Sequence, residues 1–428
     1  MASSEEVRKK YDEYIIPSQI RYYKDPLVLE RGHGAKVVDA EGKEYLDFFA
    51  GILVTGLGHG NQRVNQAVSE QMAKLGHTSS LYLNERVAAL AERLAHITPG
   101  KLKKSFFTCS GTEADETAVL MARHFTGRQD IIALRHGYSG RSQLAMNLNG
   151  IGPWKIGAGL GGVVRALAPY CYRCPLKLKP ETCGMACAQD LEETIRTSSN
   201  GGPAALIAEP ITGVSGFITP PKEYFKVAVE IVRRHGGIFI CDEVQSGWGR
   251  TGKHWFTIQH YGVDPDILTT AKAVANGFPL GVTIATPEVA DSLKGLHIST
   301  FGGSPVQAAA ALATIDEMAD RKLPERADAL GKILGAAIDR LTERYAQIDD
   351  SRGMGLMRAF EFVKDKTSRE PDAALCNRAF EAARERGLLV GKAGLYGNCF
   401  RVAPPLTISE AELGAGIERL ESAISSVL

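Results

Sequence analysis

A group of polar residues follows a short apolar run near residue 105, where "KKSFFTC" gives way to "SGTEADETAVLMARHF". Ser110 and Glu113 have the spacing of a capping box, and small and apolar residues then recur on one helical face. The start of such a helix presents free backbone N–H groups, two hydroxyls and the positive end of the helix dipole. The stretch therefore suits a bound phosphate, although an ordinary capped helix fits it as well.

A carboxylate and an amine follow two further apolar runs. Asp242 ends the run "GGIFIC", and Lys272 follows the run "DPDILTTA" 30 positions later. Ligands of open α/β sheets collect beyond the carboxyl ends of the strands, so both side chains are candidates for a site. Taken singly, the acidic residue can be a helix cap and the lysine a surface charge.

These three features together meet the needs of one cofactor, pyridoxal 5'-phosphate. The phosphate cradle anchors the cofactor, the carboxylate keeps its pyridine nitrogen protonated so that the ring withdraws electrons, and the lysine forms the Schiff base. The combination is far more specific than its members. The sequence therefore predicts a pyridoxal-phosphate site at Ser110, Gly111, Thr112, Asp242 and Lys272.

Four of the eight cysteines, Cys171, Cys174, Cys183 and Cys187, fall within "YCYRCPLKLKPETCGMAC". A C-x2-C pair followed by a C-x3-C pair resembles zinc-ligand spacing, but the eight residues between the pairs are fewer than in most zinc modules. A closed four-thiolate site would be structural, because catalytic zinc needs an open position. An iron–sulfur cluster and a surface insertion with reduced thiols are the alternatives.

The stretch "GAGLGG" at residues 157–162 fits the dinucleotide-binding pattern G-x-G-x-x-G. That pattern needs a strand before it and a helix after it. Here "GIGPWK" precedes the glycines and the strand-like "VVRALAPY" follows them. We therefore expect no nucleotide site in this stretch.

The elements that must position these residues alternate between helical patterns and short apolar runs from about residue 60 to 310. Runs such as "DIIALRH" and "AALIAEP", with helices such as "PKEYFKVAVEIVRRHG" between them, are typical of a largely parallel sheet covered on both faces. Later, "LPERADALGKILGAAIDRLTERYA" predicts a long amphipathic helix, "GMGLMRAFEFV" a strand and "AALCNRAFEAARERG" another helix. The predicted fold class is α/β, a large domain with a mostly parallel sheet and a smaller α+β domain.

The length supports the same division, because 428 residues exceed one ordinary core. We expect an N-terminal segment over residues 1–60, with a helix, strands and an active-site loop, that packs with the small domain. The large cofactor-binding domain is predicted to span residues 61–318 and the C-terminal small domain residues 319–428.

Charge and composition favour a small ligand. The chain has 50 basic and 49 acidic residues, so neither nucleic acid nor an anionic membrane is an expected partner. The start, "MASSEEVRKKYDEYIIPSQ", carries charge of both signs and no apolar run, which argues against a targeting peptide. No segment reaches the roughly 20 apolar residues that span a bilayer. We expect reduced cysteines and a cytoplasmic location.

Six motifs follow one another along nearly the whole chain, namely "SGTEA", "AEPI", "DEVQSGWGRTG", "TTAKAVANGFPLG", "STFGGSP" and "FRVAPPLTIS". In this order they resemble the class III, or ω-, aminotransferases of the pyridoxal-phosphate-dependent fold type I. Within that family the sequence looks most like the alanine–glyoxylate aminotransferase 2 group, with 4-aminobutyrate aminotransferases and dialkylglycine decarboxylase as relatives. The resemblance implies a homodimer with active sites at the subunit interface, and it leaves a higher oligomer open.

The resemblance also implies a role for each matching residue. Tyr138 is expected to stack on the pyridine ring, Gln245 to hydrogen-bond the phenolic oxygen, and Thr300 to reach the phosphate from the partner subunit. Ser139 stands where the family usually has His, and Ser304 stands where many relatives have Asn. The implied cofactor-binding residues are Ser110, Gly111, Thr112, Tyr138, Glu209, Asp242, Val244, Gln245, Lys272 and Thr300, and the implied catalytic residue is Lys272.

Two arginines match family positions that bind substrate carboxylates. Arg401 matches the arginine that clamps the α-carboxylate, a task suited to a planar guanidinium. Many relatives that handle ω-amino acids mask this arginine with a glutamate, and Val214 stands in that place here. Arg141 matches the arginine that holds the distal carboxylate of 4-aminobutyrate in some relatives, or it is a solvated loop residue.

The loop "AGILVTGLGHG" resembles the family loop that closes over the substrate. It is expected to supply an apolar wall, with Tyr82 contributed across the dimer, although these side chains could equally be core. The implied substrate-binding residues are Arg401, Arg141, Leu53, Val54 and Tyr82.

The sequence therefore predicts an aminotransferase with a ping-pong mechanism, in which Lys272 moves the Cα proton as general base and acid. The expected donor is alanine or an ω-amino acid such as β-alanine, 3-aminoisobutyrate or 4-aminobutyrate, and the acceptor is a keto acid such as pyruvate or glyoxylate. A decarboxylating transaminase like dialkylglycine decarboxylase is one alternative. A metal-binding or redox protein centred on the four clustered cysteines is the other.

Overall fold

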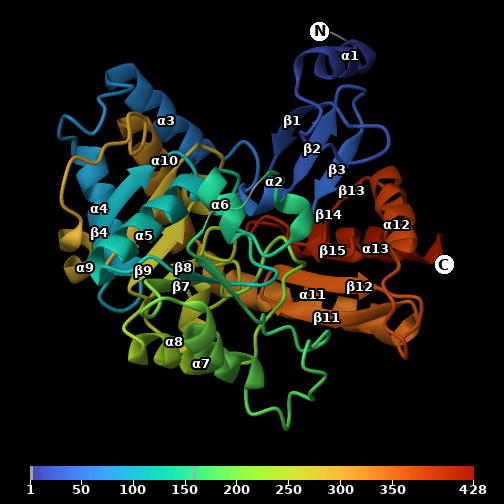
Figure 1. The fold of residues 1–428 in the computed structure, drawn as a ribbon. Helices are drawn as coiled ribbons and strands as arrows, with labels where there is room; N and C mark the ends of the chain where they lie inside the picture. Colours follow the sequence, from blue (N-terminus) through green and yellow to red (C-terminus); the bar gives the residue numbers. More distant parts are fainter. Residues whose placement is uncertain (1–2, 158, 160) are drawn as a thin grey trace.

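The computed structural model describes residues 3–157, 159 and 161–428. Met1 and Ala2, at the start of the predicted N-terminal segment, lie outside the described residues, as do Ala158 and Leu160 in the stretch "GAGLGG". The named strands form one seven-stranded sheet and two four-stranded sheets. Figure 1 shows the large sheet in one half of the molecule and the two small sheets in the other.

The seven-stranded sheet is mostly parallel, as predicted. Only β10 runs antiparallel, to its neighbours β4 and β9, and the remaining pairs are parallel. In their order across the sheet the strands are β4 (Lys104–Thr108), β10 (Gly281–Ala285), β9 (Ile267–Thr270), β8 (Ile238–Asp242), β7 (Ala205–Ala208), β5 (Ile131–Leu134) and β6 (Val163–Ala166). The predicted apolar runs thus form the strands whose carboxyl ends carry the candidate site.

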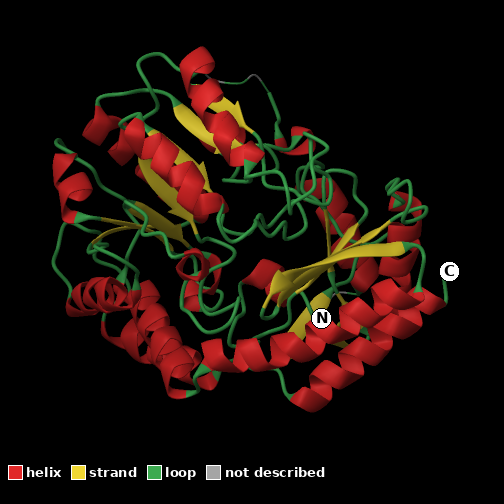
Figure 2. Cartoon of the chain, turned by 90° about the horizontal axis from the view of Figure 1, so that it is seen from below, coloured by secondary structure: helices red, strands yellow, loops and turns green. Residues whose placement is uncertain are grey.

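Helices cover both faces of this sheet, which explains why its strands are apolar without alternation. In β8, Ile238 and Ile240 pack in a cluster with α5 (Gly111–Thr126), whereas Phe239 belongs to the main core with α8 (Tyr224–Arg234). Figure 2 shows helices on both sides of the strands. The helices on the two faces hold the strands, and therefore the residues at the strand ends, in place.

Other helices surround the large sheet and connect it to the rest of the chain. α10 packs against α3 and α4, and α7 packs against α8. Their bounds are α3 (Gln62–Lys74), α4 (Glu85–Ile97), α6 (Gln143–Leu148), α7 (Ala186–Ser198), α9 (Pro287–Ser292) and α10 (Pro305–Asp320), with the short 3-10 helices η1 (Gly152–Trp154), η2 (Thr257–Tyr261) and η3 (Lys272–Ala275).

The N-terminal strands share a sheet with the C-terminal part of the chain. β13 (Leu388–Leu389) pairs in parallel with β3 (Glu44–Asp47), beside β2 (Lys36–Asp39) and β1 (Leu29–His33). The same end of the molecule carries α1 (Ser4–Tyr14) and α2 (Ala50–Leu53). This pairing agrees with an N-terminal segment that packs beside the small domain, and the division after residues 60 and 318 stays a prediction.

The third sheet is antiparallel, in the order β11-β12-β15-β14. The predicted single strand over "GMGLMRAFEFV" is wrong, because the chain turns at Gly355 and Leu356 and forms two strands of a hairpin. The predicted helices before and after this stretch are confirmed as α11 and α12. The elements are α11 (Leu323–Arg344), β11 (Ile348–Met354), β12 (Met357–Phe362), α12 (Ala373–Glu385), β14 (Gly391–Ala393), β15 (Cys399–Val402) and α13 (Glu410–Ser425).

Hydropathy along the described helices gives no membrane span. None of the helices within the described residues is both long enough and apolar enough to cross a bilayer.

Candidate active site

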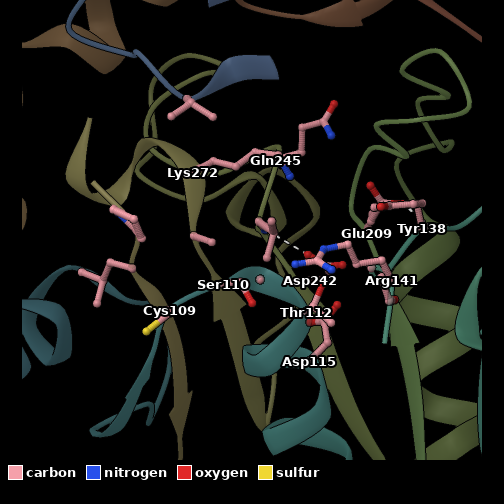
Figure 3. Close-up of a pocket in the computed structure, with 18 of the residues that line it drawn as sticks. Cys109, Ser110, Thr112, Asp115, Tyr138, Arg141, Glu209, Asp242, Gln245 and Lys272 are labelled. Carbon is pink, nitrogen blue, oxygen red and sulfur yellow. Dashed lines mark hydrogen bonds between the residues drawn. The ribbon is translucent and has the colours of Figure 1, made fainter. Parts of the chain in front are cut away.

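A cavity of about 350 Å³ opens where β4, β8 and β9 end and where the segments after β5 and β7 begin. Figure 3 shows side chains from these separate elements converging on it. Its lining consists of Val54, Cys109, Ser110, Gly111, Thr112, Asp115, Tyr138, Ser139, Gly140, Arg141, Glu209, Asp242, Val244, Gln245, Ala271, Lys272, Gly277, Phe278, Pro279 and Leu280. The strand ends that the sequence singled out therefore meet at one place.

One side of the cavity is the start of α5. The Ser110 side chain accepts a hydrogen bond from the Glu113 N–H at 3.3 Å. The other half of the expected capping box differs, because Glu113 accepts from the Cys109 N–H at 2.6 Å. A Cβ on Gly111 would lie 2.8 Å from Cγ1 of Val244, so only glycine lets the helix start come this close to the end of β8.

Asp242 is the last residue of β8 and is buried at the floor of the cavity. Its Oδ1 accepts a hydrogen bond from the Val244 N–H at 2.9 Å. Burial raises the pKa of Asp242, while the Val244 N–H and the charge of Lys272 lower it. A carboxylate held in this way can accept a hydrogen bond from a protonated ring nitrogen.

Lys272 follows β9 and begins η3 with a left-handed backbone, φ 49°. This conformation is uncommon for a residue with a side chain, and strained residues of this kind cluster at functional sites. Burial lowers the pKa of the Lys272 amine, while the charges of Asp242 and Glu209 oppose the shift. The amine is thereby closer to its neutral, nucleophilic form than an ordinary lysine.

Glu209 joins two loops beside the cavity. Its Oε1 accepts from the Tyr138 N–H at 3.0 Å, and its Oε2 accepts from the Gly213 N–H at 2.7 Å. Burial and the charge of Asp242 raise its pKa to about 8. The Tyr138 ring packs edge-on against Trp154, with centroids 5.2 Å apart. Glu209 therefore fixes the aromatic wall of the cavity.

The residues present fit pyridoxal phosphate. The helix start offers unpaired N–H groups and hydroxyls in a cradle that a Cβ at Gly111 would fill, which suits a phosphate. The buried carboxylate of Asp242 and the amine of Lys272 line the same cavity. Ser110, Gly111 and Thr112 would hold the phosphate, Asp242 the ring nitrogen and Lys272 the aldehyde carbon.

Arg401 lies behind the cavity lining. Its Nη1 donates to Oε1 of Gln245 at 3.2 Å and to the Gly213 carbonyl at 3.3 Å. The guanidinium lies over the rings of Phe49 and Phe217, 4.7 and 5.7 Å from their centroids. It is buried, and its Nε finds no hydrogen-bond partner among the described residues. One buried donor is thus left for a further acceptor.

The other predicted substrate residues divide into two groups. Arg141 and Val54 line the cavity, with Arg141 exposed at its mouth. Leu53 does not line the cavity and is buried in an apolar cluster with Phe49 and Phe217, and its predicted place in the pocket wall stays a prediction. Tyr82, 71% exposed, and Thr300 do not line the cavity of the single chain. Their predicted reach across a dimer stays a prediction.

Sequence reasoning missed several residues of the lining. Phe278, Pro279 and Leu280 follow Lys272 within a motif that the sequence had singled out. Asp115 lies in the first turns of α5, and its acidity next to a predicted phosphate cradle was the available signal. Cys109 ends the run before Ser110. Only the folded chain shows which faces of these residues meet the cavity.

The predicted structural zinc at the four clustered cysteines is not supported. Within the described part of the chain, no three or more His, Cys, Asp or Glu side chains are placed to hold a metal ion. Cys171, Cys174, Cys183 and Cys187 all border a small cavity of about 20 Å³, but as free thiols. Burial raises the pKa of Cys187 to about 11, whereas zinc binds thiolates. The spacing of the four cysteines resembles that of zinc ligands, but spacing alone does not make a metal site.

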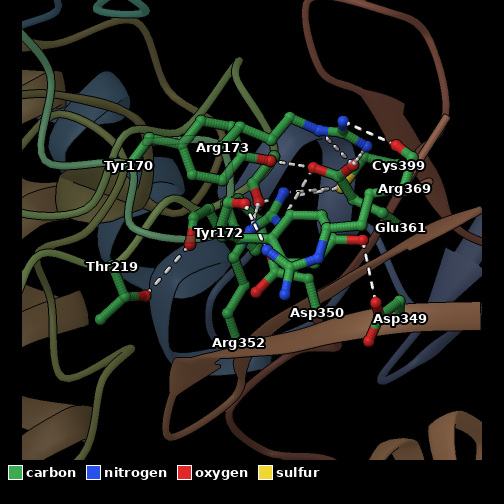
Figure 4. A network of polar contacts seen from close by, with 12 residues as sticks. Tyr170, Tyr172, Arg173, Thr219, Asp349, Asp350, Arg352, Glu361, Arg369 and Cys399 are labelled. Carbon is green, nitrogen blue, oxygen red and sulfur yellow. Dashed lines mark hydrogen bonds and ion pairs between the residues drawn. The ribbon is translucent and has the colours of Figure 1, made fainter. Parts of the chain in front are cut away.

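A polar network anchors this cysteine-containing stretch instead, as Figure 4 shows. Nε and Nη2 of Arg173 donate to Oε2 of Glu361 in β12, at 2.9 and 2.6 Å. Tyr170 also donates to Glu361, and Arg352 pairs with it at 3.2 Å. The Tyr172 hydroxyl donates to Asp349 at 3.0 Å. The stretch is therefore fixed to the C-terminal sheet by the Arg173–Glu361 ion pair and by hydrogen bonds from two tyrosines.

The chain is similar to known proteins over nearly its whole length. A family model described as aminotransferase class-III matches residues 19–424. A mitochondrial alanine–glyoxylate aminotransferase 2 homolog from Arabidopsis thaliana is 38% identical, over 99% of this chain and 88% of the relative. A leucine/methionine racemase from Thermococcus litoralis is 37% identical, over 99% of this chain and 96% of the relative. The solved structure of an (S)-enantioselective ω-transaminase from Thermomicrobium roseum has a TM-score of 0.93 at 35% identity, covering 100% of this chain and 99% of that chain.

Proposed function

The chain belongs to the class III aminotransferases, and we propose that it moves an amino group from alanine or an ω-amino acid to a small keto acid. The observation that carries the proposal is the placement of Asp242 and Lys272 at neighbouring strand ends, on one cavity that begins at the α5 N-terminus. This arrangement provides an anion site, a carboxylate and an amine on one cavity.

Each of these residues has a defined task in the proposed reaction. When bound, pyridoxal phosphate supplies an electron-withdrawing ring that stabilises the charge left on Cα after a proton is removed. The N–H groups at Gly111 and Thr112 would hold the phosphate, and Asp242 would accept a hydrogen bond from the ring N–H. Nζ of Lys272 takes the Cα proton and returns it, because burial favours its neutral amine.

The α-carboxylate of the substrate is proposed to bind Arg401. Support comes from the free Nε of this arginine and from Val214, which places no carboxylate beside the Gly213 carbonyl that Arg401 contacts. α-Amino and α-keto acids such as alanine, pyruvate and glyoxylate are therefore the proposed core substrates. The printed name of the Arabidopsis relative, an alanine–glyoxylate aminotransferase, agrees with this choice.

A distal carboxylate is proposed to bind Arg141. Its side chain lies at the mouth of the same cavity, on the side of Tyr138 and Glu209 (Figure 3). Donors that carry their amine away from the carboxylate then follow, namely β-alanine, 3-aminoisobutyrate and 4-aminobutyrate. Relatives named 5-aminovalerate aminotransferase and probable 4-aminobutyrate aminotransferase support this wider donor range.

The proposed assembly is a homodimer in the cytoplasm. Apolar side chains are exposed in the two segments that carry Tyr82 and Thr300, and the rings of His77 and Phe301 join these segments at 5.3 Å. Exposed apolar patches of this kind mark interaction surfaces. All eight cysteines are free thiols, which suits a reducing compartment. Light scattering on the purified protein tests the assembly.

A screen of single half-reactions tests the function. The visible absorption of the cofactor-loaded protein is followed after adding alanine, β-alanine, 3-aminoisobutyrate, 4-aminobutyrate or a simple amine. Loss of the band with formation of the matching carbonyl product, a keto acid from alanine and an aldehyde from a terminal amine, supports the proposal, and no loss with any of these amines refutes it. Release of carbon dioxide from a 2,2-dialkylglycine would identify the decarboxylating alternative instead. Interconversion of L- and D-amino acids would indicate the activity named for the Thermococcus relative.

A further inference from the structure

A second buried carboxyl group lies next to Asp242. Asp115, only 1% exposed, belongs to α5 and lines the same cavity. Its Oδ1 accepts a hydrogen bond from the Thr269 hydroxyl at 2.6 Å. Its Oδ2 has no hydrogen-bond donor among the described residues. Part of this buried carboxyl group therefore lacks the partner that an ionised carboxylate requires.

The register of the large sheet explains how the two carboxyl groups meet. Thr269 in β9 is the Cα partner of Asp242 in β8. Asp115 bonds to Thr269 from the helix that packs across both strands, so it faces Asp242 as well. The carboxyl groups of Asp115 and Asp242 line the same cavity, and each shifts the pKa of the other. Figure 3 shows Asp115 on the α5 side of Asp242 and Lys272 on the opposite side.

Two carboxyl groups this close in a buried site cannot both be ionised. The titratable groups that act on Asp115 are Asp242 and Glu209, and Lys272 faces the same group of carboxyls. Burial and then the charge of Asp242 raise the pKa of Asp115 well above its ordinary range. For Asp242, the Val244 N–H, the Lys272 charge and the Asp115 contact all lower the pKa that burial raises. The proton of the pair therefore resides on Asp115.

We propose that Asp115 is a positioning residue that retains its proton and donates a hydrogen bond to the carboxylate of Asp242, so that Asp242 stays ionised opposite the cofactor ring nitrogen. The inference rests on the proposed role of Asp242 in binding that nitrogen. Thr269 holds the Oδ1 side of Asp115, which leaves the protonated oxygen to face Asp242. Asp115 thus keeps Asp242 charged, and it does so from α5, the helix whose first residues form the proposed phosphate cradle.

Two substitutions test whether Asp115 acts on Asp242 as a hydrogen-bond donor. Asp115→Asn keeps an acceptor for Thr269 and an N–H donor for Asp242, whereas Asp115→Ala removes both. The affinity of the cofactor-free protein for pyridoxal phosphate is measured by quenching of tryptophan fluorescence across acidic and neutral pH. Infrared spectra of the same cofactor-free samples report the carbonyl stretch of protonated carboxyl groups. Asp242→Asn and the exposed Glu230→Gln serve as controls.

In the wild type, the affinity for pyridoxal phosphate should decrease as the pH is lowered, with a midpoint at the acidic pH where Asp242 gains a proton. Asp115→Ala should move this midpoint up by about one pH unit, because Asp242 loses a donor that stabilises its charge. Asp115→Asn should leave the midpoint unchanged and remove one protonated-carboxyl band, while Glu230→Gln should retain that band.

A downward shift of the midpoint in both variants would show an ionised Asp115 and would overturn the proposal. An unchanged midpoint in Asp115→Ala, or an unchanged infrared band in Asp115→Asn, would also overturn it. These failures are distinct from a failure of the proposed function. If the wild type did not bind pyridoxal phosphate, or if Asp242→Asn bound it as tightly as the wild type, the role of Asp242 itself would fall and this inference with it.

Discussion

Nη1 of Arg401 donates a hydrogen bond to Oε1 of Gln245 across 3.2 Å. Gln245 lines the cavity, and Arg401 lies behind it, held also by the carbonyls of Gly213 and Lys392. In the proposed binding mode, a substrate carboxylate would accept from the free Nε of Arg401 and compete with the Gln245 amide oxygen for Nη1. This competition favours the carboxylate, because its negative charge pairs with the guanidinium and its two oxygens can accept from the arginine side by side.

Arg401→Gln should weaken the reaction only for substrates with a carboxylate near the amine. We expect the rate of absorbance loss with alanine to fall by about 100-fold, since a charge-assisted contact worth roughly 1.5 to 3 kcal/mol is removed. The rate with a simple amine should change little. Arg378→Gln, at an exposed position of α12, is the matched control. An equal decrease in rate for both donors would mean that Arg401 supports the fold and does not bind the substrate carboxylate.

Arg141→Gln should have the complementary effect. Its side chain lines the mouth of the cavity, so it should reduce kcat/KM for 4-aminobutyrate and β-alanine by about 10-fold and leave alanine nearly unchanged. The ratio of kcat/KM values for 4-aminobutyrate and alanine is the measurement. A constant ratio in the variant would place Arg141 in the solvent with no role in donor choice.

Glu209 should make the stability of the cofactor-free protein depend on pH. Burial raises its pKa from an ordinary 4.5 to about 8, so its protonated form is favoured in the folded state. The free energy of unfolding contributed by this group should therefore fall as pH rises from about 4.5 to about 8. Between these limits the wild type should lose roughly 2 to 4 kcal/mol relative to Glu209→Gln in denaturant titrations.

The exposed Glu230→Gln is the control for this pH effect, because its difference from the wild type should stay nearly constant over the same range. A difference between the wild type and Glu209→Gln that did not decrease with pH would show that Glu209 is already ionised in the folded protein at low pH.

Arg173→Ala should destabilise the protein without touching the cofactor site. Glu361 is buried and would lose the paired donors of Arg173, a change that typically costs about 3 kcal/mol. Thermal unfolding is the measurement, with Lys179→Ala in the same cysteine-containing stretch as the control. A strong chelator should shift the wild-type melting temperature less than Arg173→Ala does. If the chelator lowered the melting temperature more than Arg173→Ala does, a bound metal would be what stabilises this stretch.

The strands and their polar ends could be predicted because short apolar runs record burial on both faces of a sheet. Ser110, Asp242 and Lys272 follow such runs directly, and the structure brings all three to one cavity. The hairpin at Gly355 was missed, because two short apolar strands joined by a tight turn look like one longer strand in sequence.

Other parts of the site depend on contacts between distant elements, which spacing does not encode. Leu53 packs into an apolar cluster and Arg401 bonds to Gln245, and neither contact follows from the local sequence. Tyr82 and Thr300 are expected to act only when a second chain is present. For Cys171 and its neighbours, the spacing resembled metal ligands, but the placement of the thiols decides whether a metal can bind.

The central claim is that Lys272 carries out amino transfer in this cavity, and one single-turnover measurement tests it directly. Cofactor-loaded enzyme is mixed with alanine, and the loss of visible absorption and the pyruvate formed are measured together. Lys226→Ala, at an exposed position of α8, is the control. We predict about one pyruvate per bound cofactor for the wild type and the control, recovery of the band with glyoxylate, and a rate at least about 100-fold lower in Lys272→Ala. Undiminished pyruvate formation by Lys272→Ala, or no carbonyl product from the wild type with any amino donor, would contradict the account.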